Sequence, residues 1–122
     1  MCVNFSTQNP QVLLAKFDAA ISQKEQKGKI ETWEKSSDGN FYTHKAKEWH
    51  KKAWFMPSVQ GQKLVFNIIK PQNADISRVT YGYYHGHLIE TFLNHFDQSF
   101  GEGGASALPT GNDNVSSRQA SA

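Results

Sequence analysis

Residues 49–70 read WHKKAWFMPSVQGQKLVFNIIK and include the most apolar run of the chain, at residues 63–70. A second run at residues 49–57 precedes it, and the tripeptide Gln60-Gly61-Gln62 lies between the two. Short runs rich in Val, Ile, Phe and Trp that flank a turn containing Gly are typical of a β-hairpin. We therefore predict two adjacent antiparallel strands in the middle of the chain.

The residues on either side of this hairpin predict further strands. Residues 29–35 and 41–47 flank Ser36-Ser37-Asp38-Gly39-Asn40, which is a strong turn sequence, and residues 77–84 form one more strand-like run. Because the connections between these strands are short, they favour an antiparallel meander over parallel βαβ units.

Apolar residues at helical spacing predict one amphipathic helix on each side of the strands. The N-terminal helix begins at Asn9-Pro10, a favourable cap and first-turn pair, and ends at Gly28. Its apolar positions are Leu13, Leu14, Phe17, Ala20 and Ile21. Those of the C-terminal helix are Leu88, Ile89, Phe92, Leu93, Phe96 and Phe100. We predict an α+β fold, an antiparallel β-meander of four to five strands with both helices packed on one face.

The composition changes after Phe100, where residues 101–122 read GEGGASALPTGNDNVSSRQASA. This stretch is small and polar and has no aromatic residue, so it cannot bury enough surface to offset the entropy lost on ordering. We predict a single domain over residues 1–100 and a disordered polar tail over residues 101–122.

The composition of the 122-residue chain excludes several classes of protein. Its 13 Lys and Arg against 11 Asp and Glu give a net charge of +2, which argues against a polycation. No apolar run approaches the ~20 residues of a membrane helix. Cys2 is the only cysteine, so no internal disulfide can form. The N-terminus shows no secretion signal, and we expect a cytoplasmic protein without a cofactor.

The predicted sheet has an apolar side that the helices leave uncovered. If both helices lie on one face, the alternating residues of the central hairpin place Trp54, Met56, Val65 and Ile69 on the other face. An exposed apolar sheet face is typical of a partner surface, although a strongly curled sheet would also bury it. These four residues are therefore candidates for an interface with a second copy or with another protein.

Lysines and aromatic residues interleave in residues 41–55, FYTHKAKEWHKKAWF. Lysines neutralise phosphates and aromatic faces stack on bases, which are the two requirements for binding single-stranded nucleic acid. The candidate residues for this function are Lys45, Lys47, Trp49, Lys51 and Lys52. The alternative interpretation is an edge strand that lysines protect from aggregation.

Tyr81, Tyr83 and His85 form a third candidate site. In an extended strand they would line one face, and rings with polar tips suit a ligand pocket in which His85 acts as an acid or base. The alternative is that the tyrosines simply pack in the sheet. His85 and His87 also have a metal-like spacing, but no further ligand motif accompanies them, so we predict no metal site and no catalytic residue.

These features favour a binding or interaction module over an enzyme, with self-association through the sheet face as the leading hypothesis. One alternative is a single-stranded nucleic-acid binder that uses residues 41–55. The other is a small-ligand binder or enzyme that uses residues 81–85.

Overall fold

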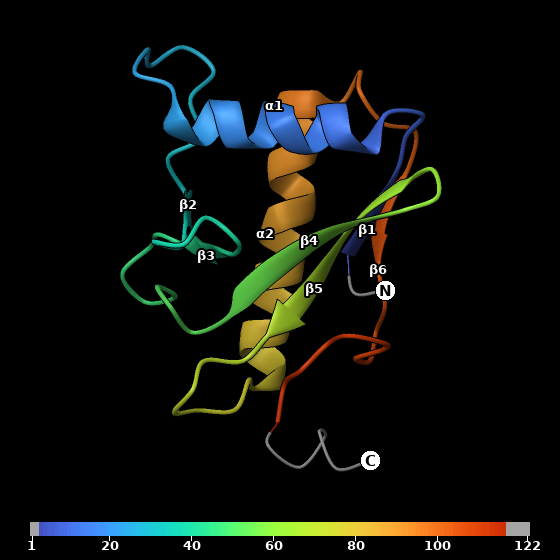
Figure 1. The fold of residues 1–122 in the computed structure, drawn as a ribbon. Helices are drawn as coiled ribbons and strands as arrows, with labels where there is room; N and C mark the ends of the chain where they lie inside the picture. Colours follow the sequence, from blue (N-terminus) through green and yellow to red (C-terminus); the bar gives the residue numbers. More distant parts are fainter. Residues whose placement is uncertain (1–2, 117–122) are drawn as a thin grey trace.

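The computed structural model describes residues 3–116 and shows a six-stranded antiparallel sheet with two helices (Figure 1). The strands follow the order β2-β3-β4-β5-β1-β6 across the sheet. In chain order the elements are β1 (Val3–Ser6), α1 (Pro10–Ser22), β2 (Trp33–Lys35), β3 (Tyr42–His44), β4 (Trp54–Gln60), β5 (Lys63–Ile69), α2 (Arg78–Phe96) and β6 (Gly103–Ala105). The α+β class and the antiparallel meander, which runs from β2 to β5, are confirmed. The sheet has six strands where we predicted four to five.

The central hairpin forms as its alternation predicts. β4 and β5 pair in register from Trp54 opposite Ile69 to Gln60 opposite Lys63. Gly61 in the intervening turn has a φ of +61°, a left-handed conformation that glycine adopts without steric cost. Successive residues of both strands therefore point to opposite faces of the sheet.

The far side of the sheet is built by the two ends of the described chain. β1 pairs with β5 along its whole length, and β6 pairs with the other side of β1. Residues 103–105 and Asn114, which belong to the stretch that we predicted as a disordered tail, therefore contact the sheet. Residues 117–122, which belong to the same prediction, lie outside the described residues.

A buried carboxylate holds the end of this C-terminal segment. Asp113 accepts hydrogen bonds from the Asn67 side chain at 2.8 Å and from the Ile68 N–H at 3.2 Å. Next to it, Asn114 forms a parallel bridge with Ile69. Backbone pairing and one carboxylate thus hold against the sheet a stretch with few large apolar side chains, which composition alone cannot reveal.

We predicted a strand over residues 77–84, but residues 78–84 form the beginning of α2. Ser77 caps the helix, since its hydroxyl accepts a hydrogen bond from the Thr80 N–H at 3.2 Å. The buried residues of α2 recur at helical spacing and are Thr80, Tyr84, His85, Leu88, Thr91, Phe92 and Phe96. Packing of this stripe against the sheet overrides the strand preference of the tyrosines.

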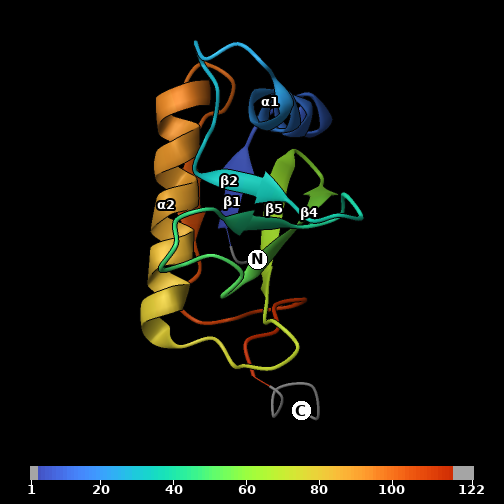
Figure 2. The same cartoon turned by 90° about the vertical axis from the view of Figure 1, so that its left-hand side faces the viewer.

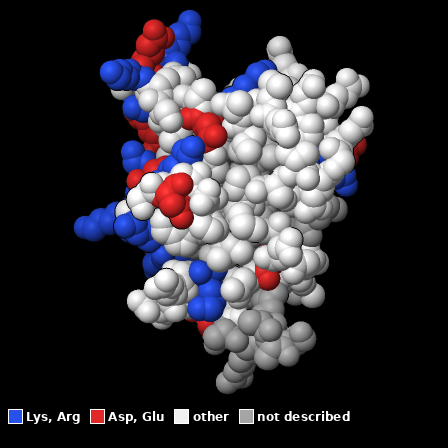
Figure 3. Space-filling view, viewed as in Figure 1, with Lys and Arg blue, Asp and Glu red and all other residues white. Residues whose placement is uncertain are grey.

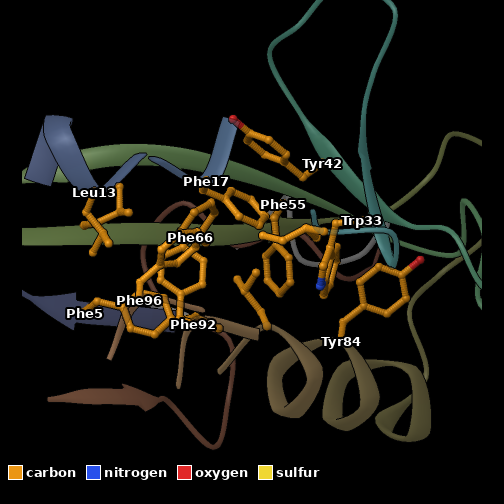
Figure 4. Packing of buried hydrophobic residues seen from close by; sticks show 14 of the residues in the cluster. Phe5, Leu13, Phe17, Trp33, Tyr42, Phe55, Phe66, Tyr84, Phe92 and Phe96 are labelled. Carbon is orange, nitrogen blue, oxygen red and sulfur yellow. The ribbon is translucent and has the colours of Figure 1, made fainter. Parts of the chain in front are cut away.

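The buried side chains form one aromatic core between the sheet and the helices (Figure 4). The Phe92 ring of α2 stacks on Phe5 of β1 with centroids 4.2 Å apart, and lies 5.0 Å from Phe17 of α1. α2 lies along one face of the sheet, whereas α1 crosses its end (Figures 1 and 2). The predicted packing of both helices on one face is therefore only partly matched, because the helices share a core but not a layer.

Candidate functional site

A cleft of about 730 Å³ lies where the β2–β3 hairpin meets the ends of β4 and β5. Its floor is apolar and includes half-buried Phe41, Trp54 and Ile69. Lys35, Lys51 and Lys70 line the same cleft. We refer to this site as the corner cleft. Its size falls within the range of small-molecule sites in proteins.

The corner cleft lies on the face of the sheet turned away from α2. Phe55 of β4 points toward α2, where its ring centroid lies 6.1 Å from that of Tyr84. Trp54 therefore points to the opposite face, as does Ile69, its partner in β5. Figure 3 shows this face, on which charged side chains gather along the side that carries β2 and β3 while most of the remainder is uncharged.

The acidic groups of the corner cleft are already engaged within the fold. Glu34 pairs with His50. The Asp38 carboxylate accepts hydrogen bonds from the Ser36 hydroxyl and from the Asn40 N–H. These two bonds, the Ser36 bond above all, hold the pKa of Asp38 below its ordinary value.

The lysines of the corner cleft are less engaged than its acids. Lys35 lies 3.6 Å from the Asp18 carboxylate, and the Lys70 ammonium donates to the Pro71 carbonyl oxygen at 3.1 Å. The Lys51 ammonium has no ion pair or hydrogen bond within the described chain. The cleft therefore presents positive charge beside an apolar floor.

The backbone around Lys51 is fixed to the sheet in an uncommon conformation. Lys51 has a φ of +60°, which few residues other than glycine adopt. Its N–H donates to the hydroxyl of buried Thr43 at 3.1 Å, and that hydroxyl donates to the Ala53 carbonyl oxygen at 2.8 Å. The loop is thus tied to β3, and Lys51 projects from a supported position.

The structure divides the residues that we predicted to bind nucleic acid. Of the five, only Lys51 lines the corner cleft. Trp49 instead stacks on Tyr83 of α2, with ring centroids 3.9 Å apart. The other three, Lys45, Lys47 and Lys52, are exposed and lie outside the cleft. Residues 45–53 form a loop, so the alternative of a lysine-protected edge strand is wrong.

The four predicted interface residues do not form one exposed patch. Trp54 and Ile69 lie in the corner cleft, Met56 is half-buried, and Val65 is fully buried. Asn67, which shares a face of β5 with Val65, is also buried because Asp113 bonds to it. The C-terminal segment thus covers part of the face that we expected to be open.

Tyr81, Tyr83 and His85 do not line a common pocket, because they lie on a helix and not on a strand. Tyr81 and His85 stack with ring centroids 3.8 Å apart, and the Tyr81 hydroxyl donates to the Ser106 carbonyl oxygen at 2.9 Å. Tyr83 points elsewhere and stacks on Trp49. Burial lowers the pKa of His85.

Two histidines that are 43 residues apart in the sequence meet beside Tyr83. His44 Nδ1 accepts a hydrogen bond from the Ala46 N–H at 3.0 Å, and His44 Nε2 lies 3.3 Å from His87 Nδ1. The proton of neutral His44 is therefore on Nε2, which donates to His87. Burial, followed by the charge of His87, lowers the pKa of His44 to about 4. We refer to His44, Trp49, Tyr83 and His87 as the inner cluster.

The sequence pattern gave no indication of the inner cluster, since β3 and α2 supply one histidine each. Within residues 3–116 no three His, Cys, Asp or Glu residues group as metal ligands. No helix in this part of the chain is long and apolar enough to cross a membrane. No protein-family model, curated protein or solved structure matches the chain.

Proposed function

We propose that this protein is a non-enzymatic binding module for single-stranded nucleic acid, and that the corner cleft holds roughly one or two nucleotides. The observation that carries the proposal is the presence of half-buried Trp54 in one cleft with Lys51 and Lys70. A base is a flat ring that stacks on an aromatic side chain with about 1–3 kcal/mol, and its phosphate attracts lysine.

Trp54 is better placed for stacking than the other two tryptophans. Trp33 is fully buried, and its indole N–H donates to the Thr91 hydroxyl at 3.0 Å. Trp49 has Tyr83 stacked on its ring. The Trp54 indole N–H has no hydrogen-bond acceptor among residues 3–116, so Trp54 offers a ligand both a ring and a donor.

The fold does not account for the positions of Lys51 and Lys70, neither of which forms an ion pair among residues 3–116. The edges of the sheet are β2 and β6, so protection of an edge strand would not require Lys51, which lies in a loop. Lys70 directly follows β5, a central strand. A ligand that carries negative charge accounts for both positions.

The state of the acid–base groups supports binding over catalysis. His50 is paired with Glu34, and the Ser36 hydroxyl donates to Asp38 to close the β2–β3 turn. Neither pair leaves a nucleophile beside a free base, which nucleophilic catalysis requires. We place this binding function in the cytoplasm, as the single cysteine of the sequence suggests.

The test is a titration of ¹⁵N-labelled protein with pyrimidine oligonucleotides of about eight residues, DNA and RNA, at low salt. We expect the Trp54 indole N–H and the amides around Lys51 and Lys70 to shift first. A duplex of the same length should shift them far less, because its bases are already stacked and paired. Absence of any shift at low salt, or shifts confined to Lys45 and Lys47, would overturn the proposal.

A further inference from the structure

The outer side of α2 carries an exposed apolar stripe that no part of residues 3–116 covers. Figure 2 shows α2 forming one side of the molecule, with the sheet on its inner side only. On the outer side Val79 is 70% exposed and Leu93 is 53% exposed. Gly82 and Gly86 lie between them and are exposed as well. This face of α2 is opposite to the stripe that packs into the core.

Packing within the described part of the chain does not require the two glycines. A Cβ atom at Gly82 or at Gly86 would meet nothing within 4 Å, so neither position needs glycine for packing inside the described chain. Glycine is nevertheless among the least favourable residues in the interior of a helix. Its advantage on a helix surface is that another backbone can approach closely.

The residues around the glycine pair are chemically symmetric about its midpoint. Three residues outward on each side lie apolar Val79 and Ile89, and four residues outward lie Arg78 and Glu90. Arg78 and Glu90 carry opposite charges, both are exposed, and neither forms an ion pair within the described chain.

From this symmetry we infer that α2 docks against α2 of a second copy of the chain, antiparallel and related by a two-fold axis that passes between Gly82 and Gly86. In that arrangement Arg78 of each copy faces Glu90 of the other, and Val79 faces Ile89. The same surface then meets itself with matched charges at both ends, as a two-fold interface requires. A parallel arrangement would instead place like charges side by side.

The dimer differs from the self-association that the sequence predicts, which would use the other face of the sheet. Because the corner cleft lies on the face turned away from α2, both cleft openings remain free in the dimer. The inference is therefore independent of the proposed function. A contact along one helix is small against the ~1,600 Å² of a stable interface, so we expect dimerisation to depend strongly on concentration.

The test is sedimentation equilibrium of the full chain at low salt, from about 10 μM to about 1 mM. We expect a monomer–dimer equilibrium in this range. Arg78→Glu and Glu90→Arg should each weaken the dimer at least about tenfold, because each places two like-charge pairs in the interface. The double variant reverses both charges and should restore dimerisation to within about threefold of the original.

Substituting the glycines separates the dimer from the stability of the fold. Gly82→Ala with Gly86→Ala should raise the melting temperature by several degrees, because alanine favours the helix and has space there. The same variant should weaken dimerisation, because the methyl groups hold the helices apart. A strictly monomeric chain over the whole range, or a dimer that the double charge reversal fails to restore, would overturn the inference.

Discussion

The corner cleft and the inner cluster both draw basic and aromatic residues from the same stretch, 41–55, yet their groups are satisfied to very different degrees. In the inner cluster Trp49 stacks on Tyr83 and His44 bonds to both Ala46 and His87. In the corner cleft Trp54 and Lys51 have no such partners among residues 3–116. Neighbouring residues thus serve packing on one side of the sheet and line an open cleft on the other, where we propose that nucleic acid binds.

The two regions differ because alternate residues of a strand point to opposite faces. Phe55 continues the core side that the inner cluster adjoins, while Trp54 points away from it. Lysines and aromatic residues that are close in sequence therefore do not by themselves indicate a binding surface. They indicate one only when they lie on the same face of the sheet and their polar groups have no hydrogen-bond partner within the fold.

The largest expected effects on stability and on affinity come from substituting Trp49 and Trp54, respectively. Trp49→Ala removes the stack on Tyr83 and should lower the free energy of unfolding by about 2–3 kcal/mol, while the folded protein retains its affinity for oligonucleotide. Trp54→Ala should cost about 1 kcal/mol or less and abolish most of the binding. Urea unfolding and oligonucleotide titration of both variants measure the two effects. Equal losses of affinity in the two variants would remove the distinction between the regions.

An intermediate effect concerns pH and the inner cluster. The unfolded chain protonates His44 near its ordinary pKa of about 6.5, whereas the fold resists protonation until about pH 4. The folded state binds fewer protons between these values. The stabilisation is therefore fully present above about pH 6.5 and is lost as the pH falls toward about 4.

We expect this loss to be on the order of 2 kcal/mol, since partial access of water reduces what the full shift would give. Protonation also breaks the bond from the Ala46 N–H to His44 Nδ1, because both ring nitrogens then carry protons. Urea unfolding from pH 7.5 down to about pH 4 measures the loss. His44→Gln should flatten the profile relative to the original chain, and an unchanged profile would contradict the role of His44.

The smallest expected effect concerns Lys51 and its backbone. Lys51→Gly relieves the left-handed conformation, so the free energy of unfolding should rise by up to about 1 kcal/mol. Affinity for oligonucleotide should fall several-fold, because one cation of the cleft is lost. Thermal unfolding and titration of the same variant measure both changes. A loss of stability would show that the ammonium, and not the backbone, is what the fold requires at this position.

The elements that the sequence predicts correctly are those that local sequence patterns determine. The β4–β5 hairpin is encoded locally, by two alternating runs and a left-handed Gly61, and was predicted correctly. β6 has little signal of its own, since it is ordered by backbone pairing with β1, and β1 alternates buried Val3 and Phe5 with polar residues over only four positions. The start of α2 has a sequence signal in the Ser77 cap, but the tyrosines that follow favour a strand.

The corner cleft was predictable only in pieces. Trp54 and Ile69 follow from the register of the hairpin, and Lys51 from the interleaving of lysines with aromatics. Phe41 and Lys70 line the same cleft because the β2–β3 hairpin folds over the ends of β4 and β5. No local sequence spacing encodes this arrangement. The His44–His87 pair likewise depends on docking between β3 and α2.

The most direct measurement compares two double variants of equal charge. Binding of a fluorescent pyrimidine oligonucleotide to Lys51→Gln/Lys70→Gln and to Lys45→Gln/Lys47→Gln is followed by anisotropy at low salt. Both variants lose the same net charge, so non-specific attraction falls equally. We predict at least about tenfold weaker binding for the cleft pair and less than about a threefold change for the other pair. Equal losses in the two variants, or a larger loss for Lys45 and Lys47, would contradict the assignment of the corner cleft as the binding site.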